Sequence, residues 1–296
     1  MLTGERFAAL DLPKVVIYHK NCPDGFGSAY TAWLRLGNNA SYHAMLYGDK
    51  LPALPAKAAI LIADFSLPRD QMIELANTHE LVVLDHHKTA KDACDGLPFA
   101  QFDMDRCGTM QVKDFFGVPY PLQQTTGGLG EPGKHTLADY IQDRDLWKWE
   151  LPDSHEISAG LASYPYDFMQ WHFLDLDALR AEGTAILRYQ NQLVEQIAKT
   201  ARHCEVLNKK GIGVNTPILQ SEVGDYLLKQ HPEAAFAAMY FWNLHLEEVY
   251  SLRSRSAEEC NVGALANHFG GGGHPRAAGF KITKEMAQVY AASVTK

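Results

Sequence analysis

Cysteine is scarce in this sequence, and its spacing argues against two kinds of stabilisation. The five cysteines of the 296-residue chain are scattered, and no two of them form a CxxC pair. A structural zinc site and a disulfide framework are therefore not expected, and a reducing cytoplasm is the compartment that fits best.

Long apolar segments are missing as well. No stretch approaches the roughly 18 apolar residues that a membrane-spanning helix needs. The N-terminal segment MLTGERFAALDLPK lacks the basic start and apolar centre of a secretory signal. Apolar residues make up 46% of the chain and charged residues 21%, which is an ordinary globular composition. At this length we expect two domains, and no membrane partner.

Positive charge is limited: 27 lysines and arginines stand against 35 acidic residues, for a formal net charge of −8. Proteins that bind long or duplex nucleic acid need many basic residues to neutralise phosphates, so this class is disfavoured. A small phosphate compound held by metal ions and a few arginines remains compatible, because local charge decides its binding. A small nucleotide or a short single-stranded oligonucleotide is thus a partner that this charge allows. The oligomeric state stays open, and a dimer is compatible.

The first half of the chain alternates aliphatic runs with helix-like segments. The runs at 14–19, 58–66 and 81–87 predict strands, and helical spacing follows the first two. Near-continuous aliphatic strands separated by helices are typical of a parallel sheet that is covered on both faces. We therefore predict an α/β fold, with residues 1–152 as an N-terminal catalytic domain.

The character of the sequence changes after residue 150. Residues 151–167 are rich in Pro, Ser and Gly, which is typical of a linker, and an apolar stripe over 182–203 predicts a helix. We interpret 153–205 as a linker with a connector helix. Residues 206–296 then form a smaller α/β domain.

Metal-capable side chains follow all three predicted strands. His19 and Asp24 come after the first strand, Asp64 ends the second, and the motif DHH at 85–87 ends the third. The carboxyl ends of parallel strands form the edge where open α/β sheets bind ligands. A single aspartate at a strand end is usually a helix cap or a turn former. Several groups that converge on one edge favour a binding site instead.

A further acidic pair, Asp143 and Asp145, ends the predicted helix at 137–147. Carboxylate and imidazole ligands without cysteine suit Mn²⁺ or Mg²⁺. Two such ions about 3.5–4 Å apart can clamp a phosphoryl group and generate hydroxide. Asp64 is a candidate for the carboxylate that bridges them.

A glycine-rich segment, GGGGHPRAAGF at 270–280, contains a second set of candidates. Consecutive glycines let backbone N–H groups approach an anion, and His274 and Arg276 add donors suited to phosphate. The alternative is a flexible connector. Arg253 and Arg255 occupy alternate positions of a predicted strand, hence one face of it. They hold substrate or lie on a solvated edge.

These motifs resemble those of the DHH phosphoesterase family. DHH follows a hydrophobic strand and is preceded by an H…D motif and an ADFS-type aspartate. GGGGHPRAAGF resembles the glycine-rich signature of the accessory domain in one subgroup. That subgroup includes RecJ-type exonucleases, nano-RNA and 3′-phosphoadenosine phosphate hydrolases, and cyclic-dinucleotide phosphodiesterases. The resemblance covers nearly the whole chain. It implies a hydrolase of short oligonucleotides or small nucleotides that uses one or two Mn²⁺ ions, with Mg²⁺ as the alternative.

The resemblance also implies a role for each matching residue. The implied metal ligands are His19, Asp24, Asp64, His86 and Asp143. Asp64 would bridge, and Asp143 is preferred to Asp145, although QDRD offers both. Asp85 would orient a neighbouring histidine, and His87 would contact phosphate; together with His86 they are the catalytic candidates. The implied substrate-binding residues are Asn21, Ser28, Arg253, Arg255, Gly271, Gly272, Gly273, His274 and Arg276. Those of the second domain would hold the far end of the substrate across a cleft from the metals.

The first motif departs from the family pattern of Asp-x-Asp, Gly or Ala, two residues and Ser. This chain has CPDGFGS. The favoured alignment places Asp24 at the second aspartate and Cys22 at the first. In the alternative alignment Phe26 replaces the second aspartate. One carboxylate is missing either way, and Cys22 is a softer ligand or a packed thiol.

The missing carboxylate leaves two other functions open. One is a catalytically impaired module with a nucleotide-binding or regulatory role. The other is a pyrophosphate or polyphosphate hydrolase, although that branch generally has a different C-terminal domain.

Overall fold

The structure is a computed structural model that describes residues 2–118 and 135–283. The chain divides into two compact units, Met1–Leu187 and Arg188–Lys296, and helix α9 (Leu176–Ala198) runs through the boundary. No helix in the described residues is both long and apolar enough to cross a membrane.

The first unit is built on a five-stranded parallel sheet with the strand order β2-β1-β3-β4-β5. Its strands are β1 (Lys14–His19), β2 (Ala40–Met45), β3 (Ala59–Ala63), β4 (Glu80–Asp85) and β5 (Ala100–Phe102). Its helices are α1 (Gly4–Ala9), α2 (Pro23–Leu36), α3 (Arg69–Thr78), α4 (Lys91–Cys94), α5 (Gly108–Phe116), α6 (Leu137–Asp145), α7 (Ser154–Ala162) and α8 (Phe168–His172), with the short turns η1 (Gly37–Asn39) and η2 (Lys88–Ala90). The predicted α/β fold class is confirmed.

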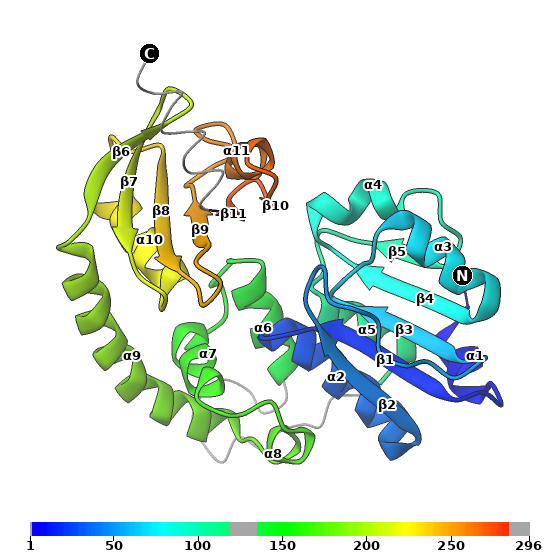
Figure 1. Ribbon diagram of the computed structural model, residues 1–296. Coiled ribbons are helices and arrows are strands. Elements are labelled where there is room, and N and C mark those ends of the chain that lie inside the picture. Colours follow the sequence, from blue (N-terminus) through cyan, green and yellow to red (C-terminus); the bar gives the residue numbers. More distant parts are fainter. Residues whose placement is uncertain (1, 119–134, 284–296) are drawn as a thin grey trace. The chain divides into compact units, whose positions relative to one another are not determined.

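Both faces of this sheet are covered by helices (Figure 1). Successive side chains of a strand point to opposite faces, so each face has apolar side chains that a helix can bury. Leu61 of β3 packs in one apolar cluster with Val112 of α5, whereas Ile60 packs in another with Met72 of α3. All five residues of β3 are buried. This explains the uninterrupted aliphatic run that marked the strand in the sequence.

Helix α2 begins at Pro23, earlier than the predicted segment 27–37, and Gly37 caps its end with a φ of 58°. Proline suits the first position of a helix because its ring fixes φ. An N–H at this position would have no acceptor within the helix, so proline loses no hydrogen bond there. The earlier start places Asp24 in the first turn, directly after β1. Asp24 is thereby held by a helix and not by a flexible turn.

The predicted linker at 151–167 is instead partly helical and packed into the first unit. Ile157 and Leu161 of α7 belong to a buried cluster with Tyr30 and the fully buried Trp171. Burial of these apolar side chains outweighs the local preference of Pro, Ser and Gly for irregular structure. The boundary between the compact units therefore falls within α9, after this segment.

The second unit contains a six-stranded mixed sheet with the order β10-β11-β9-β8-β7-β6. Its elements are β6 (Arg202–Val206), β7 (Lys209–Asn215), α10 (Gln220–Gln230), β8 (Phe236–Trp242), β9 (Glu248–Arg253), α11 (Val262–His268), β10 (Gly272–Gly273) and β11 (Ala277–Ile282). Val223 of α10 packs with Ile212 and Val214 of β7, and Leu265 of α11 packs with Leu252 of β9. The sheet thus has apolar clusters on both faces.

Candidate metal centre

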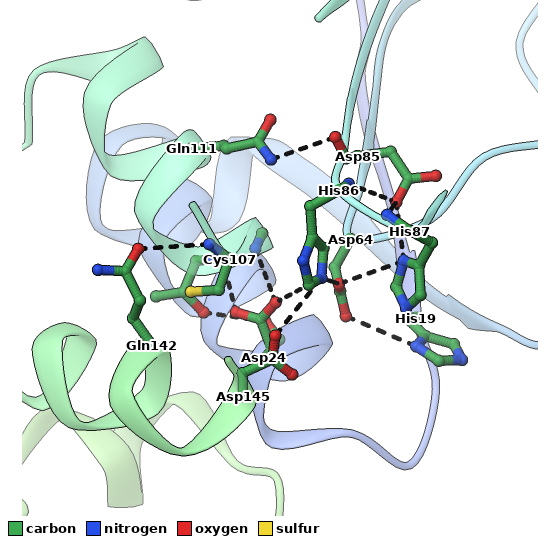
Figure 2. A network of polar contacts seen from close by, with 12 residues as sticks. His19, Asp24, Asp64, Asp85, His86, His87, Cys107, Gln111, Gln142 and Asp145 are labelled. Carbon is green, nitrogen blue, oxygen red and sulfur yellow. Dashed lines mark hydrogen bonds and ion pairs between the residues drawn. The ribbon is translucent and has the colours of Figure 1, made fainter. Parts of the chain in front are cut away.

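Three neighbouring strands of the first unit end at one site. In the sheet Tyr18 pairs with Ala63, and Ala63 pairs with Leu84. The next residues along these strands are His19, Asp64 and Asp85, so their side chains meet at the carboxyl edge of the sheet (Figure 2). The predicted convergence of these groups is therefore present in the structure.

Asp64 lies at the middle of this cluster. Its side chain is 1% exposed, and its backbone has a positive φ of 54°, an uncommon conformation for aspartate. His86 Nε2 lies 3.0 Å from Asp64 Oδ1, His19 Nδ1 lies 3.5 Å from Oδ2, and His87 Nδ1 lies 3.9 Å from Oδ1. Asp64 belongs to two groups that could each hold a metal ion, one with His19 and His87 and one with Asp24 and His86.

Asp24 is fixed by the N-terminus of helix α5. The backbone N–H groups of Gly108 and Thr109 donate to Asp24 Oδ2 and Oδ1 at 2.7 and 2.8 Å. An anion is favourable there, because the first N–H groups of a helix lack internal partners. A Cβ on Gly108 would lie 2.4 Å from Asp64 Cβ, so only glycine permits this approach. The sequence did not predict these hydrogen bonds to Asp24, and the glycine at the start of α5 is the one feature that indicates them.

Asp85 holds the histidines that follow it. Its Oδ1 lies 2.8 Å from His87 Nδ1 and accepts hydrogen bonds from the backbone N–H groups of His86 and His87 at 2.8 and 3.1 Å. Gln111 Nε2 donates to the Asp85 carbonyl oxygen at 3.2 Å. These contacts agree with the orienting role that the resemblance implied for Asp85.

Burial and neighbouring charges shift the pKa of each group. Burial, together with the charges of Asp64 and Asp145, raises the pKa of Asp24 well above its usual range. For Asp64 burial also acts to raise the pKa, but the contacts with His19 and His86 outweigh burial and hold it below its usual range. Burial alone would lower the pKa of His86, whereas the contact with Asp64 and the charge of Asp145 raise it to about 10. The pKa of His87 is raised to about 9, because its bond to Asp85 outweighs burial.

The cluster fits a divalent ion on two grounds. Asp64 Oδ2 and His19 Nδ1 are buried and lie 3.5 Å apart as an ion pair, but neither accepts or donates a hydrogen bond among the described residues, which is uncommon and calls for a ligand. His86 Nε2 lies 3.0, 3.6 and 3.5 Å from oxygens of Asp64, Asp24 and Asp145. Adjacent ligands of an octahedral ion with bonds of about 2.1 Å are about 3 Å apart.

The preference for Asp143 over Asp145 is corrected by the structure. Asp143 accepts hydrogen bonds from the backbone N–H groups of Glu150 and Leu151 at 2.9 and 3.3 Å, so it stabilises the turn after α6. Asp145 Oδ2 instead lies 3.5 Å from His86 Nε2. Residues two apart on a helix differ by about 200° in direction, so the two aspartates cannot face one site together. The sequence QDRD does not reveal which of them faces the sheet.

The first motif can be aligned from the positions of its residues. Phe26 is 3% exposed and packs against Phe168 and Trp171, with ring centroids 5.0 and 4.7 Å away. Cys22 caps α2 and lines a cavity of about 50 Å³ that Asp24 and Asp145 also line. Its pKa is raised well above the usual range by burial and by the surrounding carboxylates. Cys22 therefore stands beside the cluster, where a carboxylate is missing, and Phe26 belongs to the apolar core.

Two of the substrate-binding candidates in the first unit differ in exposure. Asn21 is exposed and has a positive φ of 60°, so it lies in the turn between β1 and α2. Ser28 is fully buried within α2, which excludes a contact with substrate in this structure and corrects that prediction.

Tyr47, which the sequence analysis did not select, lies beside the cluster. Its ring centroid is 5.8 Å from His19, 6.4 Å from His87 and 4.8 Å from Phe65. The residue is 54% exposed, so it presents an aromatic surface at the rim of the site.

Arg255 has a structural position in the second unit. Strand β9 ends at Arg253, so Arg255 lies beyond the strand and the predicted shared face does not exist. The guanidinium of Arg255 donates to the carbonyl oxygens of Leu228 and Ala234 and pairs with Glu259. These bonds explain Arg255 without a substrate. The prediction that it holds substrate is therefore corrected.

Arg253 is placed differently. It donates to Ser221 Oγ and to the carbonyl oxygen of Leu252, both at 2.8 Å, and burial lowers its pKa. The charge of Glu222 favours the ionised form of this half-buried guanidinium. Arg253 stays a candidate for binding an anion.

The glycine segment is an ordered part of the second sheet, not a flexible connector. Gly272 and Gly273 form β10 and pair with β11. A Cβ on Gly271 would lie 2.1 Å from the carbonyl oxygen of Gly279, and Gly273 has a φ of 136°. His274 is half-buried, and Arg276 is exposed. The glycines are needed for close packing, and their contact with an anion stays a prediction.

The second unit also carries a family match. Residues 204–294 match the DHHA1 domain. The chain is 22% identical over 313 residues to oligoribonuclease NrnB of Bacillus subtilis (strain 168), covering 93% of this chain and 75% of that protein. These similarities agree with the resemblance of the motifs to the DHH phosphoesterase family. It is also 28% identical over 307 residues to the uncharacterized protein R106 of Acanthamoeba polyphaga mimivirus, covering 92% of this chain and 68% of that protein.

Matches among solved structures come from several bacteria. The pGpG-specific phosphodiesterase PggH from Vibrio cholerae matches with a TM-score of 0.49 at 14% identity, over 95% of this chain and 97% of PggH. RecJ from Thermus thermophilus, solved with Mg²⁺, matches with a TM-score of 0.41 at 12% identity, over 98% of this chain and 51% of RecJ.

Exchange of the two α6 aspartates tests the corrected assignment. We expect Asp145→Asn to weaken Mn²⁺ binding at least ~10-fold, since even groups that only orient a ligand contribute about that much. Asp143→Asn should leave the affinity within a few-fold and lower the free energy of unfolding by about 1–3 kcal/mol, through its lost charged hydrogen bonds. Calorimetric titration with Mn²⁺ and urea unfolding measure the two effects. The reverse pattern would restore Asp143 as the ligand.

Protons should leave the cluster when a metal ion binds. In the metal-free protein His86 has a pKa of about 10 against an ordinary value of 6.5, so it is protonated at neutral pH. A ligating imidazole must be neutral, so Mn²⁺ affinity should rise as the pH increases from 6.5 toward 10. Calorimetry in buffers of different ionisation enthalpy counts the released protons. An affinity that is constant over this range would contradict the protonated state of the cluster.

Proposed function

We propose that this chain is a Mn²⁺-dependent phosphoesterase that hydrolyses short oligonucleotides or small nucleotides. One observation carries the proposal. Asp64 belongs to two potential metal groups at once, at the carboxyl edge of a parallel sheet. A shared carboxylate between two hard-ion sites is the arrangement that a two-metal phosphoesterase requires. The similarity to oligoribonuclease NrnB supports this chemistry.

The ligand sets differ between the two positions. Asp24, Asp64, His86 and Asp145 would hold one ion, because His86 Nε2 lies within 3.6 Å of all three carboxylates. His19 and Asp64 would hold the other together with solvent or substrate oxygens. Since no carboxylate stands at Cys22, we expect the second ion to bind more weakly. Bound ions would lower the pKa of a water molecule and stabilise charge on the phosphoryl group.

The remaining polar residues of the edge would position the substrate. His87 would contact the phosphoryl group, because its Nδ1 is bonded to Asp85 at 2.8 Å and its ring is thereby oriented. The exposed ring of Tyr47 would stack on a nucleobase next to the metals. In the second unit Arg253, His274 and Arg276 are the candidates for binding a phosphate group. A limited set of cations suits a short ligand better than a long strand.

A substrate panel tests this proposal. Chelator-stripped protein with added Mn²⁺ would be incubated with a 5′-phosphorylated dinucleotide, a pentanucleotide RNA, a long single strand, 3′-phosphoadenosine phosphate, a cyclic dinucleotide and pyrophosphate. We expect metal-dependent cleavage of the shorter nucleotides in preference to the long strand. His86→Ala should abolish this cleavage, and His268→Ala, at an exposed position of α11, is the matched control. Cleavage that survives in His86→Ala or needs no metal would refute the proposal.

Cys22 supports one second candidate, a nucleotide-binding module without turnover, because a carboxylate is missing there. The variant Cys22→Asp separates the candidates. In the proposed enzyme it should tighten binding of the weaker ion by about tenfold. It should also destabilise the metal-free protein, since a further carboxylate would join those of Asp24, Asp64 and Asp145. Cys22→Ser is the control of matched size. The nucleotide-binding module would be favoured if wild type and Cys22→Asp both bind Mn²⁺ measurably and neither cleaves any compound of the panel.

The stacking role of Tyr47 predicts a selective loss. Stacking of a base on an aromatic ring contributes about 1–3 kcal/mol, so Tyr47→Ala should raise KM for nucleotides by about 5- to 100-fold. Hydrolysis of a phosphoester without a base should change little, and Tyr47→Phe should retain wild-type KM. Steady-state kinetics on both substrate types measure this. An equal loss on both would indicate that Tyr47 acts on the metal cluster and not on the base.

A further inference from the structure

A second cluster of metal-capable side chains lies on the surface of the second unit. His203 belongs to β6, and His231 and Glu233 follow α10. His231 Nδ1 lies 3.1 Å from Glu233 Oε1, and His203 Nε2 lies 4.0 Å from the same oxygen. One ligand atom from each residue lies within 4.8 Å of the others, and the rings of the two histidines are 5.7 Å apart. Segments about 30 positions apart in the chain thus converge on one carboxylate.

The loop that carries His231 and Glu233 is held in place by hydrogen bonds to its backbone. Arg255 donates hydrogen bonds to the carbonyl oxygens of Pro232 and Ala234 at 3.1 and 2.6 Å, on either side of Glu233. The backbone N–H of His231 donates to Leu227 O at 2.9 Å, and that of Ala234 donates to His231 O at 3.1 Å. A loop that is already ordered loses little further conformational entropy when its side chains bind an ion.

The charge of Arg255 does not oppose a cation at this site. Glu259 pairs with the Arg255 guanidinium and balances it. The side chain of Glu233 is 53% exposed, so Glu233 is ionised at neutral pH like glutamate in solution. The site therefore offers one carboxylate charge and two imidazoles.

We propose that His203, His231 and Glu233 form a Zn²⁺ site that is independent of the phosphoesterase centre. Two imidazoles and one carboxylate, with the fourth position left to water, are a ligand set that zinc uses. In a tetrahedral site with bonds of about 2.0–2.1 Å, neighbouring ligand atoms are about 3.3–3.4 Å apart. The separation of 3.1 Å between His231 and Glu233 is close to this value, and His203, whose side chain is 70% exposed, can close its 4.0 Å distance by a small rotation.

The ion class separates this site from the cluster around Asp64. Imidazole-rich sites favour zinc and similar borderline ions, whereas carboxylate-rich sites favour Mn²⁺ and Mg²⁺. Strand β6 is the last strand of the described sheet, next to β7 only. An ion at this site would link that edge strand to the loop between α10 and β8. Zinc binding would therefore stabilise the second unit locally.

Hydrogen exchange of the full-length protein, followed by mass spectrometry with and without Zn²⁺, tests the site. We expect Zn²⁺ to slow exchange in peptides that cover 202–206 and 229–234. Zinc that occupies only the cluster around Asp64 would leave these peptides unchanged, which would overturn the proposal. The measurement requires no enzymatic activity, so its outcome is separate from the fate of the proposed function.

Variants identify the ligands. His203→Gln and His231→Gln should each raise the Zn²⁺ concentration needed for protection at least ~10-fold. Loss of a ligand weakens metal binding no less than loss of a group that orients a ligand. His268→Gln, at an exposed histidine outside the cluster, should leave the protection unchanged. Zn²⁺-dependent protection that persists in His203→Gln would show that His203 is not a ligand, which would contradict the proposed three-residue site. An equal loss in His268→Gln would show non-specific binding.

Discussion

The buried carboxylate of Asp64 is the constraint on which the first unit depends. A carboxylate that is 1% exposed is costly unless positive charge or hydrogen-bond donors surround it. The ends of the two strands next to β3 supply these partners, as His19 from β1 and His86 and His87 after β4. The protons on His86 and His87 compensate the charge when no ion is bound. A divalent ion could replace those protons, which couples metal binding to the same electrostatic balance.

Helix α5 shows how the surrounding fold maintains this balance. Its N-terminal N–H groups bind Asp24, which places a second carboxylate beside Asp64 in spite of their repulsion. The contact requires glycine at position 108, because any Cβ there would collide with Asp64. A partial positive charge at a helix end is fixed in position. It can therefore hold a ligand in place before any ion arrives, which limits the rearrangement that metal binding requires.

In the second unit, similar side chains have different roles according to their position. Arg253 ends β9 and donates to a hydroxyl and a carbonyl oxygen, whereas Arg255 is bonded to Glu259 and to backbone carbonyl oxygens. The same bonds of Arg255 hold the loop of His231 and Glu233. One structural arginine thus supports a candidate metal site, and the other is the candidate for binding an anion.

The sequence by itself determined the parallel sheet of the first unit and the edge where its ligands converge. Strand periodicity and the polar residues after each strand are local features, and β1 spans the predicted residues 14–19. Only the tertiary structure decided which of Asp143 and Asp145 faces the cluster, since helix rotation depends on packing partners that are distant in the chain. It also decided that Arg255 is structural and that 151–167 packs into the first unit. Burial and hydrogen-bond partners are set by contacts between remote segments, and these contacts leave no periodic pattern in the sequence.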